Sequence, residues 1–277
     1  MHISIRAENI FNLGNIIPVS NSLLTTWLVM VILLVVSFLA TRKIKKIPGT
    51  LQTVFEVLVD GIYSLFEGIL GDKIKIHFPI VATIFMFVLF NNWAGLIPGV
   101  GTIGFFEREK KEVQQLTPKV EASNITTNDT SSSQAEEPAE NNSHSAKFVP
   151  IFRGGTADLN TTTALGLIAV FYIQYAGIKA LGLTYFKKFF NFSNPINAFV
   201  GMLELILEFA KVISFSFRLF GNVFAGEVLL TVIAFLIPII APLPFIGLEL
   251  FVGFIQALVF SLLTTVFLSL AVVKAEH

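Results

Sequence analysis

The chain has 277 residues, of which 54% are hydrophobic and 14% charged, and its mean hydropathy is +0.75. These values lie outside the range of soluble globular proteins and are typical of proteins that cross a membrane several times. The 19 basic and 19 acidic residues cancel, which gives no electrostatic basis for binding nucleic acid, and the lack of cysteine excludes disulfides, thiolate nucleophiles and cysteine metal sites.

The N-terminal part of the chain predicts two membrane spans with a surface helix between them. Residues 1–22 precede an uncharged run over residues 23–41, which is long enough to cross about 30 Å of hydrocarbon. Basic residues at 42–46 follow at once, so by the positive-inside rule this end is cytoplasmic and the N-terminus is external. Residues 50–71 place carboxylates and apolar side chains on different helical faces, which predicts an amphipathic helix at the cytoplasmic surface with a solvated acidic face. A second span is predicted over residues 78–98.

A long polar loop separates the second span from the third. Asn91 and Asn92 precede it, and we interpret them as amides that hydrogen-bond between packed helices, in preference to a role in conduction. Residues 99–160 form the external loop, and its portion 101–147 mixes charged residues with Ser, Thr, Asn and Pro without apolar periodicity. That composition predicts a mobile, disordered insert.

Two polar residues stand where the third span, residues 161–184, begins. Asp158 can cap this helix through its carboxylate. Alternatively, Asp158 and Asn160 form a hydrated mouth where the span meets the outside. The sequence leaves both interpretations open.

The C-terminal part predicts one very long helix and a final span. Helical patterning over residues 195–238 would extend for about 65 Å at 1.5 Å per residue, twice the thickness of a bilayer core, so this helix must be tilted, bent or split. Gly201 and Gly221 are candidates for a bend or for close approach of another helix. Residues 247–273 return to the cytoplasmic side. The predicted fold is an all-α polytopic membrane protein with about five transmembrane helices and a long tilted helix pair in its C-terminal half.

A permanent charge, Arg218, stands in the middle of the long helix. An arginine at the centre of a span costs about 2.5 to 3.5 kcal/mol, so it normally faces protein or water with a partner nearby. Snorkelling to the headgroups is disfavoured, because apolar turns flank Arg218 on both sides. Helical spacing puts it on a largely polar stripe. The stripe consists of Glu204, Glu208, Lys211, Phe215, Arg218 and Asn222.

Polar residues also occupy positions that face away from this stripe or lie on the next helix. Glu227 falls on the opposite side of the long helix from Arg218. On the last helix Glu249 and Gln256 share one face, and a short antiparallel connection would bring that face against Arg218, Asn222 or Glu227.

The block from Arg218 to Glu227, Arg-Leu-Phe-Gly-Asn-Val-Phe-Ala-Gly-Glu, together with Gln256 on the next helix, resembles subunit a of the bacterial-type F-type ATP synthase. Three further stretches resemble the same family, and together the matches cover most of the chain except residues 101–147. These stretches are residues 87–99, 150–161 and 204–211.

The resemblance implies a non-catalytic stator subunit in a bacterial plasma (inner) membrane, with its N-terminus outside and its C-terminus cytoplasmic. It would provide two offset half-channels to the carboxyls of a rotor c-subunit ring and couple proton translocation to rotation and ATP synthesis. Its other implied partners are the peripheral-stalk b subunits, the remaining ATP synthase subunits and the lipid bilayer. No cofactor or metal is implied, and the ATP chemistry would occur on other subunits.

The resemblance also implies roles for individual residues. Arg218 would match the essential arginine, which draws a proton off each arriving rotor carboxyl by stabilising the anion, because an opposed charge lowers a carboxyl pKa. The polar partners near it would be Asn222 and Gln256, and Gln256 would hydrogen-bond or position the guanidinium. Glu227 and Glu249 would line the outer half-channel. In some relatives the position of Glu249 is occupied by a histidine. The remaining candidates are Asp158 and Asn160 at the outer inlet and Glu204, Glu208 and Lys211 in the inner half-channel.

Two alternatives compete with this interpretation. A secondary transporter could bind an anionic substrate at Arg218, but it should show paired repeats or two similarly broken helices, and the chain has only one long interrupted segment. A structural scaffold would leave Arg218, Glu227, Glu249 and Gln256 unexplained inside apolar runs.

Overall fold

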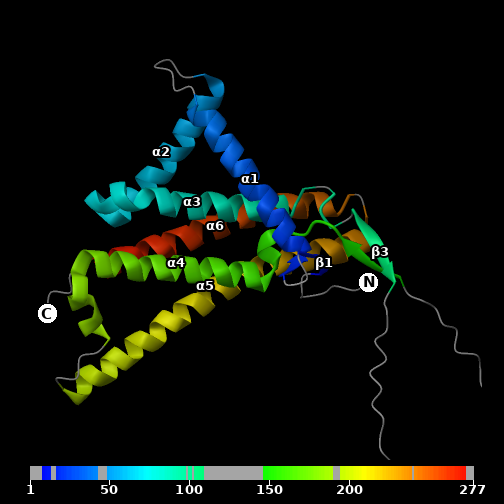
Figure 1. The fold of residues 1–277 in the computed structure, drawn as a ribbon. Coiled ribbons are helices and arrows are strands. Elements are labelled where there is room, and N and C mark those ends of the chain that lie inside the picture. The colour runs from blue at the N-terminus through cyan, green and yellow to red at the C-terminus, as the bar shows by residue number, and fades with distance from the viewer. Residues whose placement is uncertain are drawn as a thin grey trace, which may run out of the picture. The chain divides into compact units, whose positions relative to one another are not determined.

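The computed structural model describes residues 8–13, 17–42, 49–97, 99–101, 103–108, 146–189, 194–238 and 240–272, and most of them are helical (Figure 1). The α-helices are α1 (Asn21–Thr41), α2 (Thr50–Leu70), α3 (Ile74–Ala94), α4 (Leu159–Leu181), α5 (Pro195–Leu236) and α6 (Pro242–Val272). Short 3-10 helices are η1 (Gly71–Lys73), η2 (Gly155–Ala157) and η3 (Gly182–Lys188).

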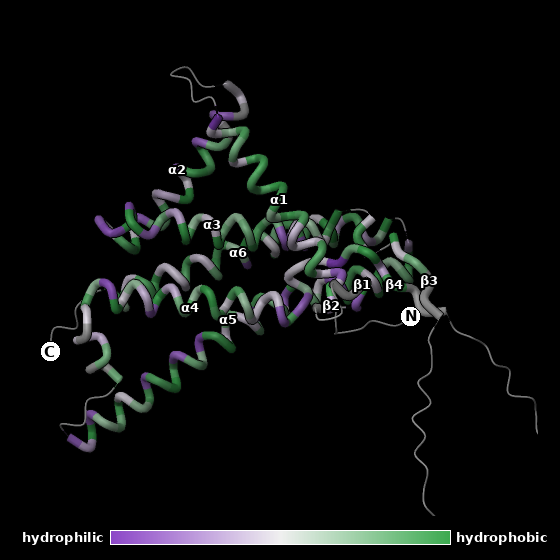
Figure 2. Tube along the Cα trace, in the orientation of Figure 1, coloured by the Kyte–Doolittle hydropathy of each residue, from purple (hydrophilic) through white to green (hydrophobic). Residues whose placement is uncertain are grey.

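Five segments of the described chain are long and apolar enough to cross a membrane. They are α1, the stretch Phe55–Ala94 that runs from α2 into α3, and then α4, α5 and α6. Figure 2 shows hydrophobic residues along the length of α1 and polar residues at its ends, as a membrane span requires. The protein is therefore a multi-pass membrane protein, and the predicted all-α polytopic fold with about five spans is confirmed.

The stretch from α2 into α3 bends at a glycine. Gly71 follows α2 with a φ of +54°, in the left-handed region that favours glycine, and η1 leads from there into α3. Figure 1 shows α2 and α3 meeting at an angle. The amphipathic helix expected over residues 50–71 and the span after it are thus separate helices.

Two helices have bounds that differ from those expected from hydropathy. α3 begins at Ile74 and ends at Ala94, where the sequence predicts 78–98. Its first turn includes Lys75, which precedes the apolar run, and Gly95 caps its C-terminus. α6 begins at Pro242 instead of residue 247, since a proline in the first turn needs no backbone N–H partner.

Small sheets accompany the helices. β1 (Asn9–Leu13) and β2 (Ile17–Ser20) form an antiparallel pair in the segment before α1, which the sequence analysis did not predict. β3 (Gly104–Arg108) and β4 (Ala146–Pro150) form a second pair, and residues Gly104–Val149 make up a separate unit. Most of the insert that we expect to be disordered, residues 109–145, lies outside the described residues.

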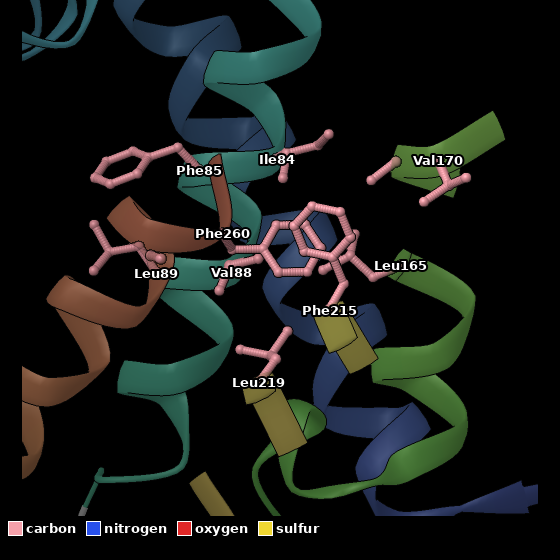
Figure 3. Close-up of a cluster of buried hydrophobic side chains, with 11 residues drawn as sticks. Ile84, Phe85, Val88, Leu89, Leu165, Val170, Phe215, Leu219 and Phe260 are labelled. Atoms are coloured by element: carbon pink, nitrogen blue, oxygen red, sulfur yellow. The ribbon is translucent and has the colours of Figure 1, made fainter. Parts of the chain in front are cut away.

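The helices enclose two buried apolar clusters, and the first one fixes the orientation of α5. Phe215 and Leu219 of α5 point into this cluster against α3, α4 and α6 (Figure 3). The rings of Phe215 and Phe260 lie 4.8 Å apart between centroids. A methyl group added at Gly166 of α4 would meet Ser216 Oγ at 2.8 Å, so α4 and α5 pack closely there. With Phe215 and Leu219 buried, Arg218 is directed to the surface of the helix bundle.

Candidate functional site

Arg218 lies on an exposed face of α5 that is otherwise mostly apolar. Its Nη2 donates a hydrogen bond of 3.3 Å to Ser214 Oγ, one turn earlier. Beside it is an open hollow of about 300 Å³. We call this region the Arg218 face, defined by Leu207, Ala210, Lys211, Ser214, Phe215, Arg218, Leu263 and Phe267, which line the hollow. No acidic side chain is among these lining residues, so this part of the described chain offers the guanidinium no carboxylate.

An amide pair joins α5 to α6 one turn beyond Arg218. Asn222 Nδ2 donates to Gln256 Oε1 at 2.7 Å, and Gln256 is almost fully buried while Asn222 is exposed. Among the described residues, Gln256 Nε2 has no hydrogen-bond partner. Among the described contacts, Arg218 bonds Ser214 and Gln256 bonds Asn222, so Gln256 makes no direct hydrogen bond to the guanidinium here. That Gln256 positions the guanidinium stays a prediction.

Glu227 is held by an arginine from a distant part of the chain. Arg153 Nε donates to Glu227 Oε1 at 3.0 Å and Arg153 Nη2 donates to Glu227 Oε2 at 3.0 Å, a two-point contact. The Arg153 side chain is 7% exposed and that of Glu227 is 36% exposed. Arg153 lies in the extended segment before η2, where its backbone N–H donates to Thr25 Oγ1 of α1 at 3.3 Å.

Glu249 lies against the turn of α5 that carries Glu227. Its carboxyl sits over Gly226, where a Cβ atom would collide with it. The side chain is half-buried, and no described residue donates a hydrogen bond to its carboxyl. Glu249 of α6 therefore lies beside the turn of α5 that carries Glu227, as the sequence analysis expected. Glu227 is paired with Arg153, whereas Glu249 has no such partner among the described residues.

Asp158 closes the N-terminus of α4 and is buried. Its Oδ1 accepts from Asn160 N at 3.0 Å, and its Oδ2 accepts from Ser22 Oγ of α1 at 2.9 Å. This geometry supports the capping interpretation over the hydrated mouth. Asn160 itself is exposed and contributes its backbone N–H to the cap.

Asn92 ties three elements together near the same place. Its Nδ2 donates to Gly253 O of α6 at 3.0 Å, and its Oδ1 accepts from Thr156 Oγ1 of η2 at 2.8 Å. These contacts agree with the packing role expected for the amide. We call this set the Arg153 junction, which consists of Ser22, Asn92, Arg153, Thr156, Asp158 and Glu227.

The three candidates for the inner half-channel lie toward the other end of α5. Lys211 Nζ donates to Glu208 Oε1 at 2.6 Å and lies 4.7 Å from the centre of the Phe267 ring. Glu204, one turn before Glu208, is half-buried. All three share the side of α5 that leads to Arg218.

A phenol packs near these carboxylates. Tyr185 of η3 donates from its hydroxyl to Gln174 Oε1 of α4 at 2.6 Å. Burial raises the pKa of Tyr185 to about 12, and the negative charges of Glu208 and Glu204 add to the shift. The electrostatic influence of both glutamates therefore reaches the end of α4.

The sequence analysis missed Arg153, Ser22 and Tyr185. Arg153 lies in the stretch 150–161 that resembles the family, from which the sequence analysis names only Asp158 and Asn160 as site residues. The criterion that identified Arg218, a permanent charge amid apolar and small residues, applies equally to Arg153 between Phe152 and Gly154. Ser22 and Tyr185 carry no such signal, since a single hydroxyl is common at helix ends.

Comparison with known proteins identifies the family. The family model described as ATP synthase A chain matches residues 23–269. The chain is 34% identical over 263 residues to the ATP synthase subunit a of Gloeobacter violaceus, covering 95% of this chain and 87% of the relative. It is 31% identical over 265 residues to that of Moorella thermoacetica, covering 96% of each, and 32% identical over 252 residues to that of Syntrophobacter fumaroxidans, covering 91% and 84%. The family match extends over nearly the whole membrane-embedded part, including the Arg218 face and all of the Arg153 junction except Ser22, and the chain belongs to the ATP synthase A chain family.

Proposed function

We propose that this chain is the proton-channel stator subunit of an F-type ATP synthase and that its Arg218 face lies against a ring of rotor c subunits. The observation that carries this proposal is the exposure of a guanidinium in the middle of a 42-residue helix, beside an apolar hollow without a carboxylate among its lining residues. Such a charge is costly in lipid unless another protein supplies its partner. A carboxyl on a passing rotor helix would be that partner.

The guanidinium would favour the ionised form of the rotor carboxyl. Two opposite charges about 4 Å apart near a protein surface attract by about 4 kcal/mol. That attraction lowers the pKa of the carboxyl, so a protonated rotor group loses its proton as it reaches Arg218. The same positive charge opposes the passage of a proton directly along α5, which separates the two aqueous half-channels.

The remaining polar residues would line those half-channels. Glu227 and Glu249 would serve the outer one, with Asn160 exposed near its inlet and Asp158 fixing the start of α4. The inner one would use Glu204, Glu208 and Lys211. Asn222 and Gln256 would hold α5 and α6 together next to Arg218.

The placement in the complex follows from these roles. The subunit would itself be non-catalytic, would contact the rotor ring, the peripheral-stalk b subunits and other ATP synthase subunits, and would lie in the bacterial plasma membrane. Its N-terminus would be external and its C-terminus cytoplasmic, as the basic residues after α1 indicate.

Replacement of Arg218 tests the proposal. In inverted membrane vesicles that contain the whole complex, Arg218→Ala should abolish ATP-driven proton pumping, while the detached catalytic sector still hydrolyses ATP. Arg42→Ala is the matched control, because Arg42 is also an exposed arginine but lies at the end of α1. Normal pumping by Arg218→Ala would remove the central role of this residue.

A further inference from the structure

Glu227 of α5 and Glu249 of α6 lie beside the same turn of α5 but differ in the hydrogen bonds that hold their carboxyl groups. Glu227 receives two parallel N–H donors from Arg153. Glu249 rests on Gly226, and no described residue donates a hydrogen bond to its carboxyl. The Glu227 carboxylate is therefore held in position by an ion pair, whereas the Glu249 oxygens remain available to water or to an approaching group.

Arg153 itself is anchored independently of Glu227. Its side chain is nearly excluded from solvent, its backbone N–H is bonded to Thr25 of α1, and it stands next to the closely packed Gly154 and Gly155. At Gly155 a Cβ atom would collide with Thr26 Oγ1, so the segment packs directly against α1. The Arg153 guanidinium thus reaches α5 from a segment that is packed against α1.

A buried arginine with this geometry has a specific electrostatic effect. An arginine guanidinium stays protonated at any physiological pH. Its planar shape lets it donate two parallel N–H hydrogen bonds to one carboxylate. Among the described residues, Arg153 from the segment before η2 pairs with Glu227, and the carboxyl of Glu249 from α6 lies over the adjoining Gly226. Arg153 compensates one negative charge at this turn, which leaves Glu249 as the second carboxyl.

We propose that Arg153 is a positioning residue that holds Glu227 as a fixed anion, and that Glu249 is the carboxyl that exchanges protons at this turn of α5. In the exchange, the Glu249 carboxylate takes a proton from a hydronium ion on the outer side and releases water. The neutral acid then passes that proton to an ionised rotor carboxyl and becomes a carboxylate again. This inference rests on the proposed function, because it assigns different roles to two residues of the proposed outer half-channel.

The test compares single and double replacements in vesicles that contain the complete complex, with pumping rates divided by the amount of chain in the membrane. Arg153→Gln should lower ATP-driven pumping by about tenfold or more, because it leaves Glu227 as an uncompensated anion beside Glu249. The double variant Arg153→Gln with Glu227→Gln should return to within about twofold of Glu227→Gln alone, since the uncompensated charge is gone. Arg153→Lys should restore part of the rate, because it keeps the charge but not the two-point contact.

Replacements of the two glutamates test the division of roles. Glu249→Gln should reduce pumping more than Glu227→Gln, and Glu249→Asp should recover part of the loss because aspartate still exchanges protons. Arg42→Gln serves as the control for loss of an arginine elsewhere in the chain. If Arg153→Gln reduces the amount of chain in the membrane, the double variant decides: recovery of both the amount and the pumping per chain supports the proposal.

Two results would overturn the inference. One is normal pumping by Arg153→Gln; the other is a double variant that pumps no better per chain than Arg153→Gln. The Arg218→Ala variant, assayed in the same membranes, separates this failure from failure of the proposed function. If Arg218→Ala is inactive and Arg153→Gln is normal, only the role of Arg153 is wrong; if Arg218→Ala pumps normally, the proposed function itself is wrong.

Discussion

The Arg153 junction and the Arg218 face each place an arginine within an apolar helix bundle, but the two arginines differ in how their hydrogen-bonding groups are satisfied. At the junction, Asp158 pairs with Ser22, Asn92 with Thr156 and Arg153 with Glu227. The side chains of Asp158, Asn92 and Arg153 are nearly excluded from solvent. On the Arg218 face, the guanidinium is exposed and has one long hydrogen bond to Ser214.

The difference separates stability from function. A buried polar group that lost its partner would destabilise the fold, so replacements at the junction should lower the free energy of unfolding. An exposed group with one weak contact contributes little to that free energy, so changes at Arg218 should leave stability unchanged and affect only the proposed proton transport. The tests of this comparison are replacements in each region, with stability and proton pumping measured separately.

The largest effect on stability is expected for Asp158→Ala. This replacement removes the cap on Asn160 N and leaves the buried Ser22 hydroxyl without its acceptor. The loss should be about 2 to 4 kcal/mol in the free energy of unfolding, measured by detergent-induced unfolding of the purified complex. Asn160→Ala is the matched control and should change the same quantity by less than about 0.5 kcal/mol, because its side chain is exposed. Equal losses for the two variants would contradict the capping role.

The next effect is expected for Gly226→Ala, which adds a methyl group where the Glu249 carboxyl lies. Overpacking of this kind costs about 1 to 3 kcal/mol, and it should also displace Glu249 and slow proton pumping. Gly221→Ala is the control on the same helix, because a Cβ atom at Gly221 meets nothing within 4 Å in this chain. Its effect on the stability of the isolated subunit should be neutral or favourable by up to about 1 kcal/mol. A Gly226→Ala variant as stable as Gly221→Ala would show that Glu249 moves aside without cost.

A smaller effect is expected when a single hydroxyl is removed from each region. Ser22→Ala loses the bond to Asp158 and should lower the free energy of unfolding by about 1 kcal/mol. Ser214→Ala loses the bond to Arg218, but on an exposed face it should leave stability within about 0.5 kcal/mol of the original chain. Thermal inactivation of the two variants in parallel measures the contrast, and a greater loss for Ser214→Ala would reverse it.

The long helices and the Arg218 face could be predicted from the sequence because both depend on local spacing. Hydropathy located the five spans, and the helical repeat placed Arg218 and Asn222 on one stripe. The contact of Gln256 with that stripe also follows, since α5 and α6 are joined by a short connection.

The Arg153 junction could not be predicted in the same way, because its contacts join distant parts of the chain. Arg153 and Glu227 are separated by 74 positions and Ser22 and Asp158 by 136, and no periodicity encodes such pairs. These contacts depend on how the segment before η2 runs between α1 and α5. The β1–β2 pair was not predicted for a different reason: its strands are short and adjoin residues without strand patterning.

The last and smallest effect concerns Tyr185, in η3 outside the spans, whose hydroxyl bonds Gln174. Burial, together with Glu208 and Glu204, raises the pKa of Tyr185 from 10.0 to about 12. A raised folded-state pKa means that the contribution of this group to stability is complete below pH 10 and is lost as the pH rises toward about 12. The ultraviolet difference between the original chain and Tyr185→Phe should therefore show a phenolate transition near pH 12. A transition near pH 10 would indicate that water reaches the hydroxyl and that the end of α4 is open. The Tyr185 hydroxyl would then resemble the Arg218 guanidinium, as a polar group that is exposed and not satisfied within the fold.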